Sequence, residues 1–115
     1  MSLATNLALT DETLNEAIAS HFWQIPASSR DAPWFHHPDY CHNWFEAAKI
    51  VSHISLNGSP TLQAALNATL HQLAGPDARP ADILLICGPR EICAAALTAW
   101  DYAEKCAVSN NIIGS

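Results

Sequence analysis

Apolar side chains recur every three to four positions in four stretches of the chain, which is the spacing of one face of an α-helix. Thr10 is a suitable N-cap for the first stretch, and a proline just beyond Trp23 predicts that this helix ends there. Asp39 can cap a second helix of about 15 residues, which the Asn-Gly pair at 57–58 ends. The apolar stripe of this second helix is expected at Trp44, Ala47, Ala48, Val51 and Ile54.

Residues 59–75 fit both a helix and a strand. Ser59 is a good N-cap, Pro60 suits the first helical position, and Gly75 followed by Pro76 suits a helix end. Alternation, as in a strand, is equally visible at Leu62, Ala64, Leu66, Ala68 and Leu70. Alanine, leucine, glutamine and asparagine are poor strand formers as a set, so propensity favours a helix.

The C-terminal part of the chain predicts one more helix. Residues 82–87 are almost wholly apolar and form either one short buried strand or a single helical turn, which periodicity cannot separate at this length. Pro89 opens the last helix, and residues 108–115 are expected to form a flexible tail. The inner face of this helix is rich in alanine: Ile92, Ala95, Ala96, Ala99, Trp100 and Ala103.

These elements predict a mainly α fold, with residues 1–115 as a single domain built as a bundle of about four helices. The alternative is an α+β arrangement in which a small sheet lies between helical layers.

Charge and composition argue against two classes of function, nucleic-acid binding and membrane insertion. The net charge is −6, and no two of the five basic residues are adjacent, so direct nucleic-acid binding is not expected. The apolar run 83–87 is far too short to span a bilayer, and the first ten residues lack the features of a signal peptide. We therefore expect a cytoplasmic protein without membrane contact, whose four cysteines are free thiols.

Seven of the nine aromatic residues fall between positions 22 and 45, around a proline-rich loop at 24–38. They form either the core where the first two helices meet or an exposed patch that binds a partner, since such residues are enriched in protein interfaces. For the second interpretation, the predicted partner-binding residues are Trp34, Phe35, His36, His37 and Asp39.

The densest polar cluster, residues 36–42, offers an alternative metal site. Histidine, cysteine and carboxylate are all metal ligands. Adjacent histidines rarely both reach one metal, and no second ligand pair appears, so we expect a polar helix entry without metal or cofactor. The ligands of the alternative site are His36, His37, Cys41 and His42. The chain also contains no glycine-rich phosphate loop and no Gly-x-Ser-x-Gly elbow, and we do not expect an enzyme.

The run Pro89-Arg90-Glu91-Ile92-Cys93-Ala94-Ala95-Ala96-Leu97 resembles the closing helix of the phage ABA sandwich domain family. Residues 9–23 and 38–51 are similar to the first and second helices of that family. The resemblance implies a small phage or prophage protein in which residues 66–73 and 83–87 pair as a hairpin. It supplies no catalytic residue.

Together these observations predict a non-enzymatic accessory protein of phage or prophage type that binds a protein partner. Inhibition of a bacterial defence complex, in the manner of an anti-CRISPR protein, is one concrete form. The alternatives are a small metal-binding protein that uses the cluster at 36–42, or a homodimer that buries the alanine-rich face of the last helix.

Overall fold

The computed structural model describes residues 3–23, 39–79, 82–83 and 87–114, with backbone alone for 107–114. These residues form five helices and no strand, so the mainly α prediction is confirmed and the α+β alternative is wrong. The helices are α1 (Leu3–Leu7), α2 (Asp11–Phe22), α4 (Trp44–Asn57), α5 (Pro60–Ala74) and α7 (Pro89–Gly114). No described helix is long and apolar enough to cross a membrane.

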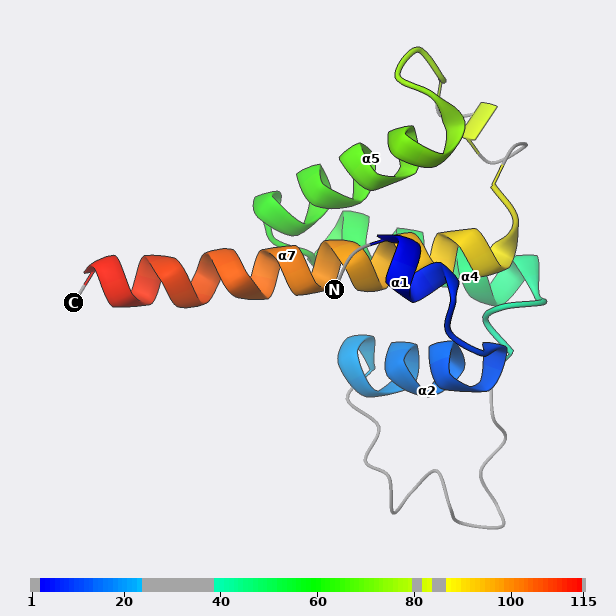
Figure 1. Cartoon of the computed structure of the whole chain (residues 1–115), viewed down its shortest axis with the longest axis horizontal. Coiled ribbons are helices and arrows are strands. Elements are labelled where there is room, and N and C mark those ends of the chain that lie inside the picture. The colour runs from blue at the N-terminus through cyan, green and yellow to red at the C-terminus, as the bar shows by residue number, and fades with distance from the viewer. Residues whose placement is uncertain (1–2, 24–38, 80–81, 84–86, 115) are drawn as a thin grey trace, which may run out of the picture.

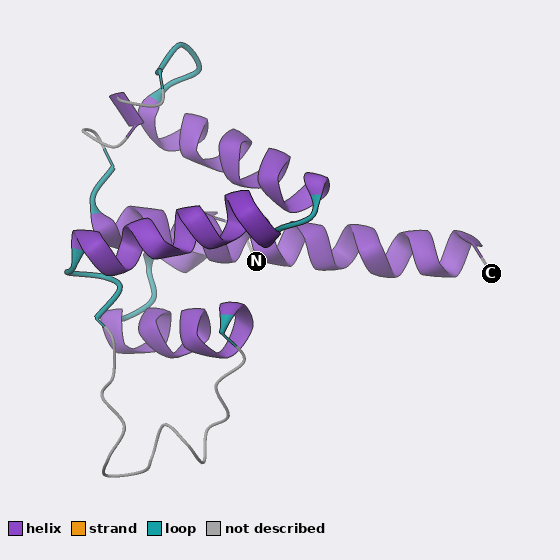
Figure 2. Cartoon of the chain, turned by 180° about the vertical axis from the view of Figure 1, so that it is seen from behind, coloured by secondary structure: helices purple, strands orange, loops and turns teal. Residues whose placement is uncertain are grey.

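Helix α7 is the centre of the fold, because each of the other four helices packs against it. Figure 1 shows α5 on one side of α7 and α2 on the other, with α1 in front and α4 behind, and Figure 2 shows the same order from the back. The alanines of α7 make this packing close: Ala94, Ala95, Ala96 and Ala99 are each 0% exposed. Most of the alanine-rich face, Ile92, Ala95, Ala96 and Ala99, is therefore covered by the chain's own helices, whereas Trp100 and Ala103 are half-buried. Homodimerisation itself stays a prediction.

The local signals at most helix ends are confirmed. The Thr10 hydroxyl accepts a hydrogen bond from the backbone N–H of Thr13, and the Ser59 hydroxyl accepts one from Leu62. Pro60 begins α5, and Pro89 begins α7. Gly75 ends α5 with a φ of 109°, a conformation that favours glycine.

The start of α4 differs from the prediction. The cap is Asn43, whose side-chain oxygen accepts from the backbone N–H groups of Phe45 and Glu46, and residues 39–42 form a turn before it. The predicted stripe is also partly wrong. Ala47 and Ile54 are buried as expected, together with Ile50, whereas Trp44 and Ala48 face outward.

The apolar segment at 82–87 shows helical rather than strand bonding where it is described. Ile83 donates to the carbonyl of Arg79 at 3.0 Å, and Cys87 donates to the carbonyl of Ile83 at 2.9 Å, both with the four-residue step of an α-helix. The hairpin expected at 66–73 and 83–87 does not form, because residues 66–73 lie inside α5.

The expected C-terminal tail continues the last helix. The backbone of α7 is helical to Gly114, and its last part extends beyond the other helices (Figure 1). The predicted flexibility of residues 108–115 stays a prediction.

Candidate docking surface at the start of α4

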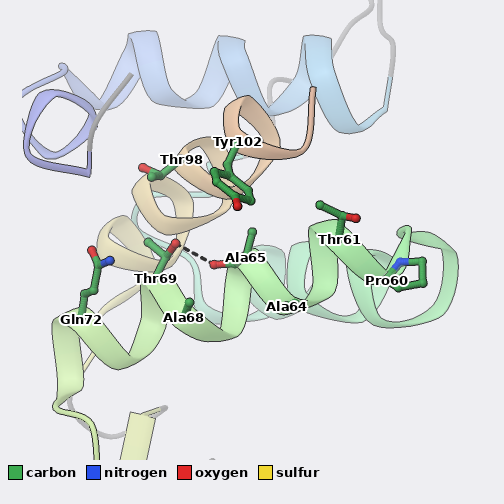
Figure 3. Close-up of a pocket in the computed structure, with 9 residues that line it drawn as sticks. All are labelled: Pro60, Thr61, Ala64, Ala65, Ala68, Thr69, Gln72, Thr98 and Tyr102. Atoms are coloured by element: carbon green, nitrogen blue, oxygen red, sulfur yellow. Dashed lines mark hydrogen bonds between the residues drawn. The ribbon is translucent and has the colours of Figure 1, made fainter. Parts of the chain in front are cut away.

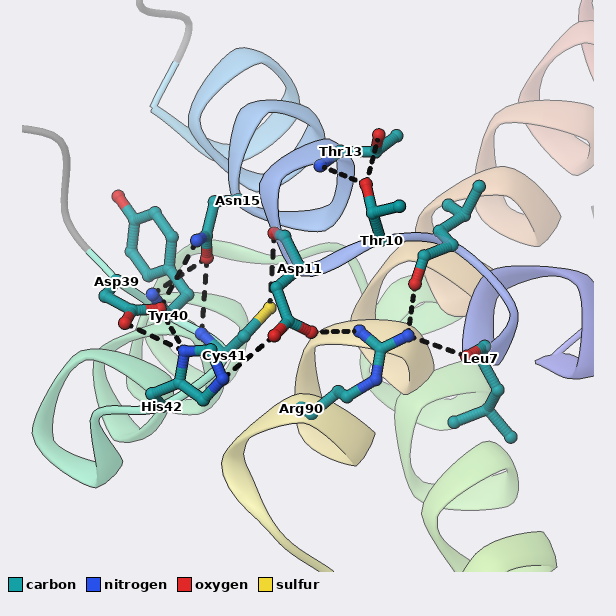
Figure 4. Close-up of polar contacts among 11 residues, drawn as sticks. Leu7, Thr10, Asp11, Thr13, Asn15, Asp39, Tyr40, Cys41, His42 and Arg90 are labelled. Atoms are coloured by element: carbon teal, nitrogen blue, oxygen red, sulfur yellow. Dashed lines mark hydrogen bonds and ion pairs between the residues drawn. The ribbon is translucent and has the colours of Figure 1, made fainter.

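The turn at residues 39–42 is held by one side chain of α2. Asn15 Oδ1 accepts from the backbone N–H of Tyr40 at 2.9 Å and from that of Cys41 at 3.2 Å. Asn15 Nδ2 also donates to Asp39 Oδ1 at 3.3 Å. An asparagine side chain that bonds two consecutive N–H groups fixes the direction in which the chain enters α4 (Figure 4).

His42 lies between two carboxylates. Its Nε2 is 2.8 Å from Asp11 Oδ2, and its Nδ1 is 2.9 Å from Asp39 Oδ2. Only the doubly protonated ring donates at both nitrogens. Hydrogen bonding to Asp39 and the charges of Asp39 and Asp11 raise the pKa of His42 above its ordinary value. Burial acts to raise the pKa of Asp39, but hydrogen bonds from His42 and Asn15 outweigh it, and that pKa is lowered.

Arg90 extends this network to α7 and α1. One guanidinium nitrogen donates to Asp11 Oδ1 at 2.7 Å, and the other donates to the carbonyls of Leu7, at 2.8 Å, and Leu9. The planar group of arginine suits such a fork of acceptors. These contacts join the start of α7 to the turn before α4, through Arg90, Asp11, His42 and Asp39 in that order (Figure 4).

The neighbouring thiols are buried. Cys41 is 2% exposed and its Sγ donates to the backbone carbonyl of Asp11 at 3.6 Å, while Cys93 is 0% exposed. Burial raises the pKa of both thiols, which keeps them protonated and poor as nucleophiles or metal ligands.

The alternative metal site is only partly within the described residues. His36 and His37 lie outside them. Cys41 is buried, whereas the ring of His42 is engaged by two carboxylates at the surface. Within the described ranges, no group of three or more histidine, cysteine, aspartate or glutamate side chains is placed to hold a metal ion.

The aromatic cluster divides between core and surface. Phe22 and Tyr40 are buried, and Trp23 stacks on Tyr40 with ring centroids 5.5 Å apart. Trp44 and Phe45, in contrast, are 46% and 70% exposed. The cluster is therefore core at some residues and exposed at others, and binding of a partner by the exposed rings stays a prediction.

The exposed residues around the start of α4 follow the predicted docking residues along the chain, with the buried Tyr40 and Cys41 between them. Of the predicted docking residues, Asp39 is described, and its side chain is 50% exposed. Trp34, Phe35, His36 and His37 lie outside the described residues. We use the name α4 entry surface for the described residues Asp39, Trp44 and Phe45.

Sequence reasoning missed Trp44 and Phe45 as surface residues because it began the helix at Asp39. A signal was present: Asn43 with Glu46 three positions later is the spacing of a capping box, and it marks the start of α4. The positive charge of Lys49 lies beside Phe45, with Nζ 4.9 Å from the centre of the ring. Glu46 balances this charge, because its Oε1 is 3.1 Å from the same Nζ.

A groove of about 630 Å³ lies between α5 and α7 (Figure 3). Small side chains such as Ala64 and Ala68 line it, together with the larger Tyr102. The hydroxyl of Thr69 is already used, because it donates to the carbonyl of Ala65 at 2.7 Å. None of its lining residues is charged at neutral pH.

Comparison of the chain with models of known families, with curated proteins and with solved structures finds no match. The resemblance to the phage ABA sandwich domain stays a prediction that rests on its sequence motif.

Proposed function

We propose that this chain is a non-enzymatic accessory protein that acts by binding another protein through the α4 entry surface. The observation that carries the proposal is the exposure of Trp44 and Phe45 beside a turn that Asn15 and His42 hold in place. Large aromatic side chains are costly to leave in water and dominate the energetics of protein interfaces. A firmly held turn lowers the entropy lost when they dock.

The charge of the chain suggests the chemistry of its partner. A net charge of −6 favours a protein with a basic surface, such as the nucleic-acid groove of a bacterial defence complex, and disfavours nucleic acid itself. Together with the phage-type motif at residues 89–97, this supports an inhibitor from a phage or prophage that acts in the host cytoplasm, in the manner of an anti-CRISPR protein. The proposal involves no cofactor.

The residues beside the surface support binding rather than catalysis. The Cys41 thiol faces inward and its pKa is raised by burial. The His42 ring, which would be a general base elsewhere, has both nitrogens occupied by Asp11 and Asp39. This arrangement stiffens the turn and leaves the imidazole no free nitrogen for proton transfer.

The test is affinity capture from a bacterial host lysate, followed by measurement of Kd with the purified captured protein. The double variant Trp44→Ala/Phe45→Ala should weaken binding about 30-fold or more, as expected for interface hot spots. Its free energy of unfolding should change by about 1 kcal/mol or less, because both rings are substantially exposed.

Leu56→Ala is the matched control, since Leu56 is an apolar residue of the same helix and is 82% exposed. It should bind as the unchanged chain does. Equal affinity of the double variant and the control would refute the α4 entry surface. Light scattering would show whether Trp44 and Phe45 instead bind a second copy of the chain. Such self-association would refute the proposal that this surface binds another protein.

A further inference from the structure

A second cavity lies at the opposite end of α4 from the α4 entry surface and shares no residue with it. Its volume is about 240 Å³, below that of drug-sized pockets, so it has room only for a small group. The cavity is lined by the ends of α2 and α4, the start of α5 and one face of α7. The inference from it goes beyond the proposed function and does not depend on it.

Three rings contribute to its wall. Phe22 is 5% exposed, and its ring centre lies 5.1 Å from that of Trp100 and 6.5 Å from that of His53. The planes of these two pairs meet at 67° and 89°, so both pairs are edge-to-face contacts. Aromatic rings set at steep angles around a small space are the arrangement with which proteins surround a methylated ammonium group, because each face carries negative potential.

The electrostatics of the cavity favour a positive ligand. Glu104 lines it, is exposed, and has no ion-pair partner among the described side chains. Phe22 and Asn57 are the last residues of α2 and α4, and helix C-termini carry partial negative charge.

Two features of α5 reduce the effect of the helix ends. Gln63 Nε2 donates to the carbonyls at the end of α4, with distances of 3.1 Å to Ser55 and Gly58. The start of α5 adds partial positive charge, part of which the Ser59 hydroxyl neutralises as it caps Leu62. With His53, which also lines the cavity, counted as neutral, the full charge of Glu104 exceeds these partial charges and the balance is negative.

We propose that this cavity binds a methylated ammonium group through Phe22, Trp100 and Glu104. A bare metal ion does not suit it, since hard cations need several oxygen ligands and Glu104 is the one carboxylate among the described residues of this wall. The ammonium group is carried by a free quaternary amine or by a methylated lysine side chain of another protein.

The test is an NMR titration of the full chain with choline and with 3,3-dimethylbutan-1-ol, which has the same shape without the charge. Choline should shift the indole N–H of Trp100 and bind at least about threefold more tightly than the neutral alcohol. Glu104→Gln should remove most of this preference. Asp77→Asn, which changes the net charge equally in a distant turn, should keep it.

A third titrant separates the two sources of the ligand. A short peptide with one trimethyllysine should bind more tightly than choline if the ligand is a side chain of a partner, and more weakly if it is a free amine. Both results support the cation site. Equal binding of choline and the neutral alcohol, shifts that map outside the cavity, or an unchanged preference in Glu104→Gln would each overturn it.

Discussion

Replacing Arg90 by methionine keeps an unbranched chain in place and removes the guanidinium group that ties α7 to the start of the fold. That group donates to Asp11 Oδ1 at 2.7 Å, to the Leu7 carbonyl at 2.8 Å and to the Leu9 carbonyl. Leu7 is the last residue of α1, where a helix leaves carbonyls without internal partners. The substitution therefore leaves two carbonyls and one carboxylate without this donor.

The expected loss of stability follows from these contacts. Arg90 is 30% exposed, so water replaces part of what is lost. We take about 1 kcal/mol for each of the two carbonyl bonds and about 0.5 kcal/mol for the half-exposed ion pair with Asp11. The free energy of unfolding of Arg90→Met should fall by about 2–3 kcal/mol. Arg90→Lys keeps the charge but lacks the planar set of donors of arginine. Its free energy of unfolding should therefore lie between those of Arg90→Met and the unchanged chain.

The assay is urea unfolding followed by circular dichroism, with Arg79→Met as the matched control. Arg79 is 87% exposed and lies 3.6 Å from Asp82, so its loss should cost no more than about 0.5 kcal/mol. If Arg90→Met were no less stable than Arg79→Met, the role assigned to this network would be refuted.

Three further predictions concern single sites. The raised pKa of His42 means that its imidazolium stabilises the folded chain fully below its ordinary value of 6.5 and that this contribution is lost as the pH rises through the raised pKa. His42→Gln should flatten that loss in unfolding midpoints, and an NMR titration giving a pKa of 6.5 or less would contradict it. Gly75→Ala should cost about 1–3 kcal/mol from backbone strain alone, since φ is 109° and no heavy atom lies within 4 Å of the added Cβ; an unchanged melting temperature would exclude that strain. Iodoacetamide should modify the partly exposed Cys106 in the folded chain and reach Cys93 only on unfolding, as mass spectrometry would show; equal rates would argue against the buried thiol.

The sequence predicted those parts of the fold whose causes are local. Ser59 and Pro60 begin α5, and Gly75 ends it, because caps and φ preferences act within a single turn. The same reasoning separated helix from strand at residues 59–75. It wrongly predicted Asp39 as the N-cap of α4, because a second good N-cap, Asn43, lies four residues later and caps the helix.

The candidate site was only partly predictable. Asp39 was identified as a docking residue and is exposed, but Trp44 was assigned to the core and Phe45 was not singled out. Local spacing gives the period of an apolar stripe, yet the direction of the stripe depends on where the helix meets its neighbours.

The chain by itself therefore determined that it folds as helices, where α2 and α5 begin and end, and that its net charge is −6. Only the tertiary structure decided that the five-residue α1 forms, since a helix this short needs outside support such as the bond from Asn6 to Thr98, 92 residues away. It also decided that Arg90 reaches Asp11, 79 residues earlier. Contacts between residues so far apart exist only after the helices have packed, so no local pattern encodes them.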